Sequence, residues 1–137
     1  MTDAAKPPGA LQQGARERAD ELPGATLTNP FGPEWDVYKV CDKVFMLLTE
    51  STGEAMVTLK ARPADGRVLC EAYPQITPGY HMNKRHWITL REAAGAGVRG
   101  DVDLGLLRDL VTESYLLVLE NSVPKRLWPV NPATFGQ

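Results

Sequence analysis

A single segment near the end of the chain does most to limit its possible folds. Residues 104–121, LGLLRDLVTESYLLVLEN, place large apolar side chains at the spacing of an α-helix. The stripe comprises Leu104, Leu107, Val111, Tyr115 and Val118, and it is widened by Leu106, Leu110 and Leu117. A stripe this broad needs an equally broad apolar partner. The segment therefore predicts a helix that begins after a cap at Asp101 or Asp103 and packs deeply on a sheet.

Strand-forming segments supply that sheet. Residues 36–50, DVYKVCDKVFMLLTE, are rich in Val, Tyr and Phe on both sides of a polar turn at 41–43, and they predict a hairpin. Residues 55–61, AMVTLKA, alternate Val57 and Leu59 with other side chains, which predicts a third strand with one buried face. Residues 86–90, HWITL, also have the composition of a strand.

Two further helices are predicted from periodicity. Apolar side chains at Leu11, Ala15, Ala19 and Leu22 indicate an amphipathic first helix. Pro63 suits the first turn of another helix, which we expect to run from about Ala64 to Tyr73, because a proline there loses no hydrogen bond. We expect its inner face to consist of Val68, Leu69, Ala72 and Tyr73.

The order of these elements predicts the fold class. One helix, three strands, a helix, one or two strands and a last helix favour an α+β fold, with helices packed on an antiparallel sheet. The glycines of AAGAGVRG lack the spacing of a phosphate-binding loop, so a nucleotide-binding fold is not expected. We expect one domain over residues 10–127, a disordered leader at 1–9, and an irregular C-terminal tail at 128–137 on the surface.

The charge balance and the lengths of the apolar runs limit the classes of function that we expect for this protein. The 15 Lys and Arg residues are balanced by 17 Asp and Glu residues, so any binding of nucleic acid must depend on a local basic patch. The longest apolar runs, 44–48 and 115–119, are far shorter than the roughly 20 residues that span a bilayer. The start of the chain lacks a secretory signal pattern, and we expect a cytoplasmic protein that does not enter membranes.

Metal binding and catalysis find little support in the sequence. Cys41 and Cys70 lack the paired spacing of zinc ligands, and we expect both to be reduced and packed. His81 and His86 lie five positions apart in a loop without a nearby carboxylate. We therefore expect no metal, no cofactor and no enzymatic activity.

Four segments resemble the MmcQ/YjbR family of small bacterial proteins. They are PFGPEWDVYKVCDKVFMLL, VTLKARP, YPQITPGYHMNKRHWITL and LRDLVTESYLLVLENSVPKR, and the resemblance covers residues 11–126. It implies an α+β fold related to secretion-chaperone-like folds. The family's double-wing arrangement further implies DNA binding, an inference from shape.

The segment TPGYHMNKRHW, residues 77–87, is the main candidate site. We expect its Pro-Gly turn to project residues 80–85 from the body and Trp87 to return to the sheet. Lysine and arginine can contact phosphate, asparagine can read a base edge, and tyrosine can stack on a base. The candidate binding residues are Tyr80, His81, Asn83, Lys84, Arg85, His86 and Trp87.

Several interpretations of this loop remain open. It can be purely structural, with Pro-Gly fixing its backbone and Trp87 filling the core. It can contact nucleic acid, or it can bind a small anionic or aromatic ligand. Lys125 and Arg126 either complement a helix end or add to a basic patch, if they fold near the loop. Our leading hypothesis is DNA binding by residues 77–87, and the alternative is a non-enzymatic module that binds a small molecule or protein in the cleft beside the loop.

Overall fold

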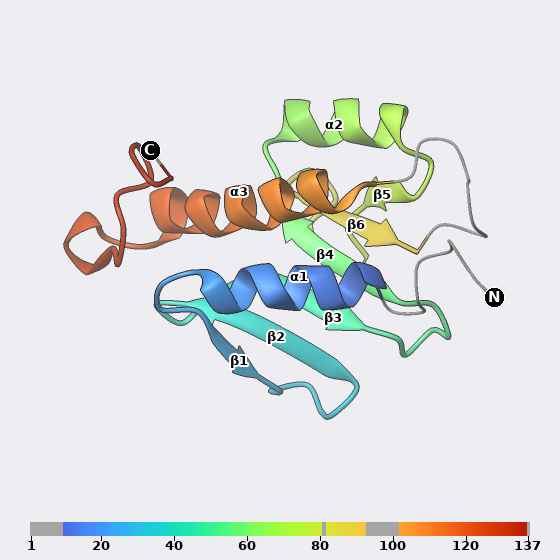
Figure 1. The fold of residues 1–137 in the computed structure, drawn as a ribbon, viewed down its shortest axis with the longest axis horizontal. Coiled ribbons are helices and arrows are strands. Elements are labelled where there is room, and N and C mark those ends of the chain that lie inside the picture. Colours follow the sequence, from blue (N-terminus) through green and yellow to red (C-terminus); the bar gives the residue numbers. More distant parts are fainter. Residues whose placement is uncertain (1–9, 81, 93–101, 137) are drawn as a thin grey trace.

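The computed structural model has a six-stranded antiparallel sheet with α-helices on one face (Figure 1). It describes residues 10–80, 82–92 and 102–136, so the predicted leader, His81 and the alternative cap Asp101 lie outside the described residues. In chain order the elements are α1 Ala10–Glu21, β1 Thr26–Thr28, β2 Trp35–Val40, β3 Lys43–Thr49, β4 Met56–Lys60, α2 Pro63–Ala72, β5 Ile76–Pro78, β6 Trp87–Arg91, α3 Leu104–Ser122 and the 3-10 helix η1 Lys125–Leu127. The predicted α+β class is confirmed.

The strands lie in the order β1-β2-β3-β4-β6-β5, and all neighbours are antiparallel. The predicted hairpin is present, and its turn places both Cys41 (φ 50°) and Asp42 (φ 67°) in the left-handed region. Two consecutive left-handed residues match the twist of the flanking strands. Strand β1 was not predicted, because three residues are too few for an alternating pattern.

Helix α3 crosses the middle of the sheet and is tied to it by one hydroxyl. Ser114 is fully buried; its Oγ donates to the carbonyl oxygen of Phe45 in β3 at 2.6 Å and accepts from the amide of Lys60 in β4 at 2.8 Å. Asp103 caps the helix by accepting from the amide of Leu106 at 2.7 Å. Burial raises the pKa of Tyr115 to about 12, and its hydroxyl donates to the carbonyl oxygen of Pro23.

Two predicted helix faces need correction. Val68 is 63% exposed and Ala72 is also exposed, whereas Leu69 and Tyr73 pack against the core as predicted, together with Gly66 and Cys70. Gly66 lies against β6, where a Cβ atom at this position would be 3.3 Å from Ile88 Cγ2, so this side of α2 faces the sheet. In α3, Leu104 is 51% exposed, because it lies at the rim of the α1–α3 contact beside Gly14.

Strand β4 is buried on both faces, contrary to the single buried face predicted. Val57 and Leu59 face the helices, yet Met56 and Thr58 are also buried. Cross-strand register places Thr58 in one row with Val37, Leu47, Thr89 and Thr77, on the face that α1, α2 and α3 leave open. We call the side of the sheet that carries this row the helix-free face.

The C-terminal tail packs against the core, whereas we expected it to lie on the surface. The indole Nε1 of Trp128 donates to the carbonyl oxygens of Leu119 and Val123 at 2.9 and 2.8 Å. The ring of Phe135 lies 6.2 Å from that of Tyr115, between centroids. Residues 128–136 therefore form turns that close one end of the core. No helix among the described residues has the length and apolar character needed to cross a membrane.

We predict that Leu107→Ala will lower the free energy of unfolding by about 2–5 kcal/mol, because it leaves a cavity beneath α3. Leu107 is 1% exposed. Leu104→Ala is the matched control from the same sequence stripe and should cost less than about 1 kcal/mol. Urea denaturation followed by circular dichroism measures both, and equal losses would contradict the burial pattern of α3.

Candidate functional site

The loop between β5 and β6 folds back onto the helix-free face. The amide of Tyr80 donates to Thr89 Oγ1 at 2.8 Å, and the Tyr80 ring stacks on Trp35 of β2 with 6.5 Å between centroids and planes 6° apart. Tyr80 is therefore half-buried and does not project as predicted. Its ring has a partner within the fold, so Tyr80 is not the free stacking platform that the sequence suggested.

Local hydrogen bonds shape the tip of this loop. Asn83 Oδ1 accepts from the amide of Arg85 at 2.9 Å, and Asn83 O accepts from the amides of His86 and Trp87. Lys84 Nζ donates to the carbonyl oxygen of Gly79 at 3.1 Å. These bonds hold a tight turn from which Lys84, Arg85 and His86 are exposed to solvent.

Trp87 returns the chain to the sheet as the first residue of β6. Its ring is half-buried and lies 5.4 Å below Lys60 Nζ, a distance that permits a cation–π contact. A Cβ atom at Gly79 would lie only 2.7 Å from Trp87 Cβ. Glycine is therefore required at position 79 for the close approach of the loop to β6.

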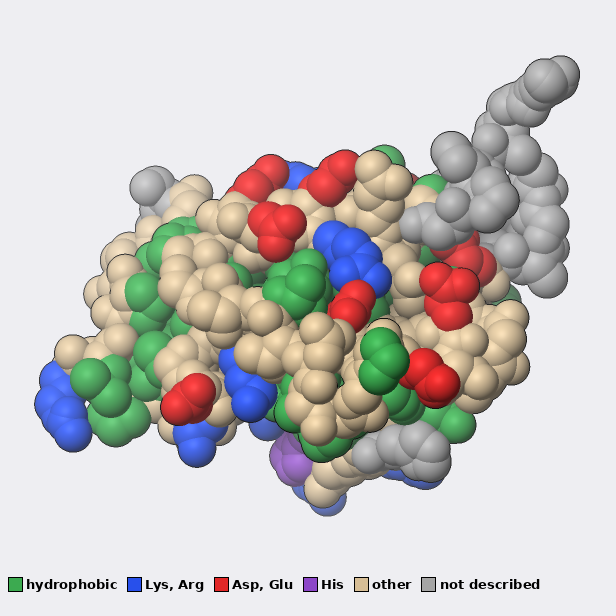
Figure 2. Space-filling model, turned by 90° about the horizontal axis from the view of Figure 1, so that it is seen from below, with side chains coloured by type: hydrophobic (Ala, Val, Ile, Leu, Met, Phe, Trp, Pro, Cys, Tyr) green, Lys and Arg blue, Asp and Glu red, His purple; other side chains and the backbone are tan. Residues whose placement is uncertain are grey.

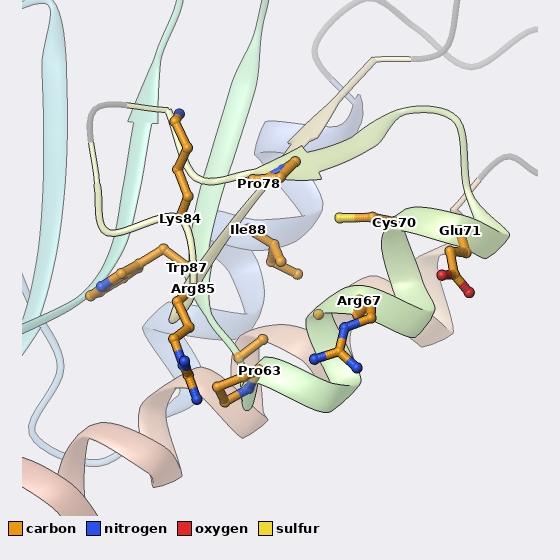
Figure 3. A pocket seen from close by; sticks show the side chains of 11 residues that line it. Pro63, Arg67, Cys70, Glu71, Pro78, Lys84, Arg85, Trp87 and Ile88 are labelled. Carbon is orange, nitrogen blue, oxygen red and sulfur yellow. The ribbon is translucent and has the colours of Figure 1, made fainter.

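A pocket of about 460 Å³ lies between α2 and this loop (Figure 3). Its walls are largely apolar and include Pro63, Pro78, Ile88 and the thiol of Cys70. The charged side chains that line it are Arg67 and Glu71 from α2 and Lys84 and Arg85 from the loop. Two segments that are distant in sequence thus contribute positive charge to one space.

The cations of this pocket are unpaired within the part of the chain that the structure describes. Arg67, Lys84 and Arg85 take part in no ion pair among the described residues, whereas nearby Arg62 pairs with both Glu113 and Glu120. Burial, and secondarily the charge of Glu71, raises the pKa of the Cys70 thiol. The thiol therefore stays protonated at neutral pH and acts as an apolar wall.

The structure unites only part of the predicted site. Lys84, Arg85 and Trp87 line the pocket, while the Tyr80 ring stacks on Trp35 of β2 and Asn83 stabilises the turn of the loop. His86 lines a separate, smaller hollow with Lys60 and Arg62. Within residues 10–80, 82–92 and 102–136, no group of His, Cys, Asp and Glu is arranged to hold a metal ion.

Lys125 and Arg126 are exposed in η1 and do not line the pocket. They lie near the β2–β3 turn, where Cys41 Sγ donates to the carbonyl oxygen of Leu127 at 3.5 Å. Figure 2 shows acidic and basic side chains interspersed on the face that it presents, without one continuous basic strip. The predicted accessory pair is thus separate from the cations of the loop.

Sequence reasoning missed Arg67. The sequence shows a charged residue one helical turn before Glu71. Only the packing of α2 beside the loop shows that this residue shares a pocket with Lys84 and Arg85. The usable signal was the glycine at 66, since a glycine inside a helix often allows a close approach.

We predict that Tyr80→Ala will destabilise the protein by about 1–3 kcal/mol, because it removes the ring that stacks on Trp35. Tyr80→Phe keeps the ring and should retain most of the stability. Thermal unfolding followed by tryptophan fluorescence provides the comparison. A fully stable Tyr80→Ala protein would show that the stack is not part of the structural core.

Comparisons of sequence and of structure identify proteins that are similar to this chain. The sequence model of the YjbR family matches residues 20–117. The YbdF protein of Escherichia coli O157:H7 is 38% identical over 123 residues, which cover 90% of this chain and 96% of that protein. The crystal structure of Deinococcus radiodurans DR2400, a DUF419-domain protein, is 37% identical with a TM-score of 0.69, over 82% of this chain and 80% of that one.

A protein from Pseudomonas syringae, 22% identical over 77% of this chain and 96% of its own, shares the fold with a TM-score of 0.61. The matched segment includes β2, β3, β4, the loop before β6 and α3 as far as residue 117, and it covers the four sequence segments quoted above except for residues 118–126. The resemblance drawn from those segments is confirmed, and the chain belongs to the YjbR family.

Proposed function

We propose that this protein is a non-enzymatic binding module whose site is the pocket between α2 and the 79–86 loop, and that its ligand carries a phosphate or similar anionic group. One observation carries the proposal: Arg67, Lys84 and Arg85 line a single pocket of about 460 Å³ with apolar walls. This volume lies within the range of small-molecule sites, roughly 300–1,000 Å³.

The three cations suit an anion with several oxygens. A guanidinium group presents paired donors that match phosphate or carboxylate. Two such groups line the pocket, Arg67 from α2 and Arg85 from the loop. Lys84 Nζ has three N–H donors, one of which is directed to Gly79 O. Figure 3 shows the Lys84 side chain pointing away from Arg85, so Lys84 contributes its charge at a different side of the pocket from the two guanidinium groups.

The non-enzymatic part of the proposal has a chemical basis. The described residues that line the pocket include no histidine, and the Cys70 thiol has a raised pKa, so a thiolate nucleophile is scarce at neutral pH. Binding by charge and shape is the chemistry that these side chains support best.

DNA is the second candidate partner, because Lys84, Arg85 and His86 are consecutive, exposed and presented by one loop. Binding a duplex by charge requires contact with several phosphates at once. Here Arg62 is occupied by Glu113 and Glu120, and Glu71 lies within the same pocket. The local balance of charge therefore favours a small anion over a polyanionic duplex.

We predict that phenyl phosphate will bind the protein in isothermal titration calorimetry and that Lys84→Ala/Arg85→Ala will weaken this binding at least about tenfold, since charge-assisted hydrogen bonds are lost. Lys125→Ala/Arg126→Ala removes the same charge from η1 and should leave the affinity unchanged. The proposal would be wrong if phenyl phosphate failed to bind, or if both double variants lost the same affinity.

The DNA candidate makes a different prediction, measured by titrating a duplex between 50 and 200 mM salt. If Lys84 and Arg85 contact phosphates, the double variant should weaken binding to all duplex sequences alike. It should also reduce the salt slope by about 1–2 units, roughly 0.9 per lost contact. Absence of salt-dependent association of the wild-type protein near 50 mM salt would eliminate DNA as the partner.

A further inference from the structure

We propose that a polar hollow between α1 and the open end of the β2–β3 hairpin binds a guanidinium group. This polar hollow has a volume of about 400 Å³, and it shares no described lining residue with the pocket beside α2. The charged and amide side chains that line it are Gln12, Arg16, Glu34, Asp36 and Glu50. The inference goes beyond the proposed function and does not depend on it.

Gln12 supplies a buried acceptor to the polar hollow. It is 5% exposed, and its Nε2 donates to the carbonyl oxygens of Thr49 and Met56 at 2.9 and 3.0 Å. Because a carbonyl oxygen can only accept, these two bonds fix the orientation of the amide and turn Oε1 away from both carbonyls. Oε1 accepts from no described donor, and it is not among the described atoms that are both fully buried and unpartnered. It therefore reaches solvent where Gln12 lines the polar hollow.

Two carboxylates lie opposite one another at the open end of the hairpin. Trp35 and Thr49 form the last cross-strand pair of β2 and β3, and the next positions outward are Glu34 and Glu50. The Thr49 hydroxyl holds the two segments together by donating to the carbonyl oxygen of Glu34 at 2.8 Å. Both glutamates are exposed, and neither forms an ion pair among the described residues. Like charges at opposite positions repel, so a cation between them would be stabilised.

The third acid of the polar hollow already has partners. Asp36 Oδ2 accepts from Arg16 Nη1 at 2.6 Å, and Asp36 Oδ1 accepts from Asn29 Nδ2 at 2.7 Å. Arg16 is thus neutralised by Asp36. The groups that remain for a ligand are the two glutamates and Gln12 Oε1, which are all acceptors, so the ligand they suit is a cation that carries hydrogen-bond donors.

The spacing of these acceptors favours an organic cation over a metal ion. A calcium or magnesium ion needs several oxygens within about 2–2.6 Å of one point. The part of the chain that the structure describes contains no group of three or more His, Cys, Asp and Glu in such an arrangement. A guanidinium group is planar, stays charged at neutral pH and directs several N–H donors outward, so it can bind separated carboxylates and an amide oxygen together.

The experiment titrates isotope-labelled protein at pH 7 with ethylguanidinium, ethylammonium or tetramethylammonium, and follows the amide chemical shifts by NMR. We expect ethylguanidinium to cause saturable shifts at Gln12, Glu34 and Glu50. Tetramethylammonium has the same charge but no N–H donor and should bind at least about tenfold more weakly, with ethylammonium between the two. Glu34→Gln/Glu50→Gln should weaken the binding of ethylguanidinium at least about tenfold.

Glu17→Gln/Asp20→Asn is the matched control, because it removes two exposed acids of α1 that do not line the polar hollow. It should bind ethylguanidinium as the wild-type protein does. Both double variants should keep the wild-type melting temperature, since all four side chains are exposed. The inference is wrong if the wild-type shifts do not saturate, if either ammonium ion binds as tightly as ethylguanidinium, or if the control loses as much affinity as Glu34→Gln/Glu50→Gln.

The blocked peptide acetyl-Gly-Arg-Gly-amide identifies the source of the guanidinium group. Shifts at the same amides would assign the polar hollow to an arginine side chain of a partner protein, whereas binding of ethylguanidinium alone would assign it to a small molecule. Binding of phenyl phosphate is a separate result, because the two sites share no described lining residue. Failure of the guanidinium site therefore leaves the proposed anion site standing, and the reverse also holds.

Discussion

The hydroxyl of Ser114 is the interaction on which the geometry of the site depends. It joins α3 to Phe45 of β3 and Lys60 of β4, and so fixes the position at which β4 ends. At the next residue, the amide of Ala61 donates to His86 O at 2.9 Å, which ties the start of the α2 connection to the end of the loop. Both sides of the pocket therefore extend from a short stretch of backbone anchored to the buried helix, and the pocket is a product of the core rather than of mobile surface segments.

Local sequence patterns predicted much of the fold because they reflect interactions between residues that are close together in the sequence. The order of helices and strands followed from periodicity, and the β2–β3 turn from its polar residues; Cys41 and Asp42 adopt the left-handed conformation that such turns need. The errors concern contacts made across the molecule. Leu104 is apolar and correctly spaced but lies at a rim, and Thr58 is polar in pattern but is 3% exposed. Periodicity along one segment contains no information about what covers its second face.

The site was predicted in part for the same reason. The basic character of Lys84 and Arg85 and the return of the chain at Trp87 could be inferred from one short loop. The position of Arg67 in the pocket lining could not be inferred, because it depends on the packing of α2 beside that loop. Tyr80 was assigned to a ligand although its ring stacks on Trp35, which lies 45 positions earlier in the sequence. A loop with an aromatic residue among basic ones has the composition of a binding site, whether the aromatic ring faces solvent or packs on the protein.

Two pairs of cations show why position matters more than number in this nearly neutral chain. Lys125 and Arg126 lie on an exposed 3-10 helix, where salt screens their attraction for charges that are more than about 8–10 Å away, one Debye length. Lys84 and Arg85 carry the same charge but border apolar walls opposite Arg67. A ligand that enters this pocket exchanges part of its water for those walls, and electrostatic attraction strengthens as the local dielectric constant falls. The proposed anion site therefore depends on local charge and burial, while the net charge of −2 provides no general attraction for polyanions.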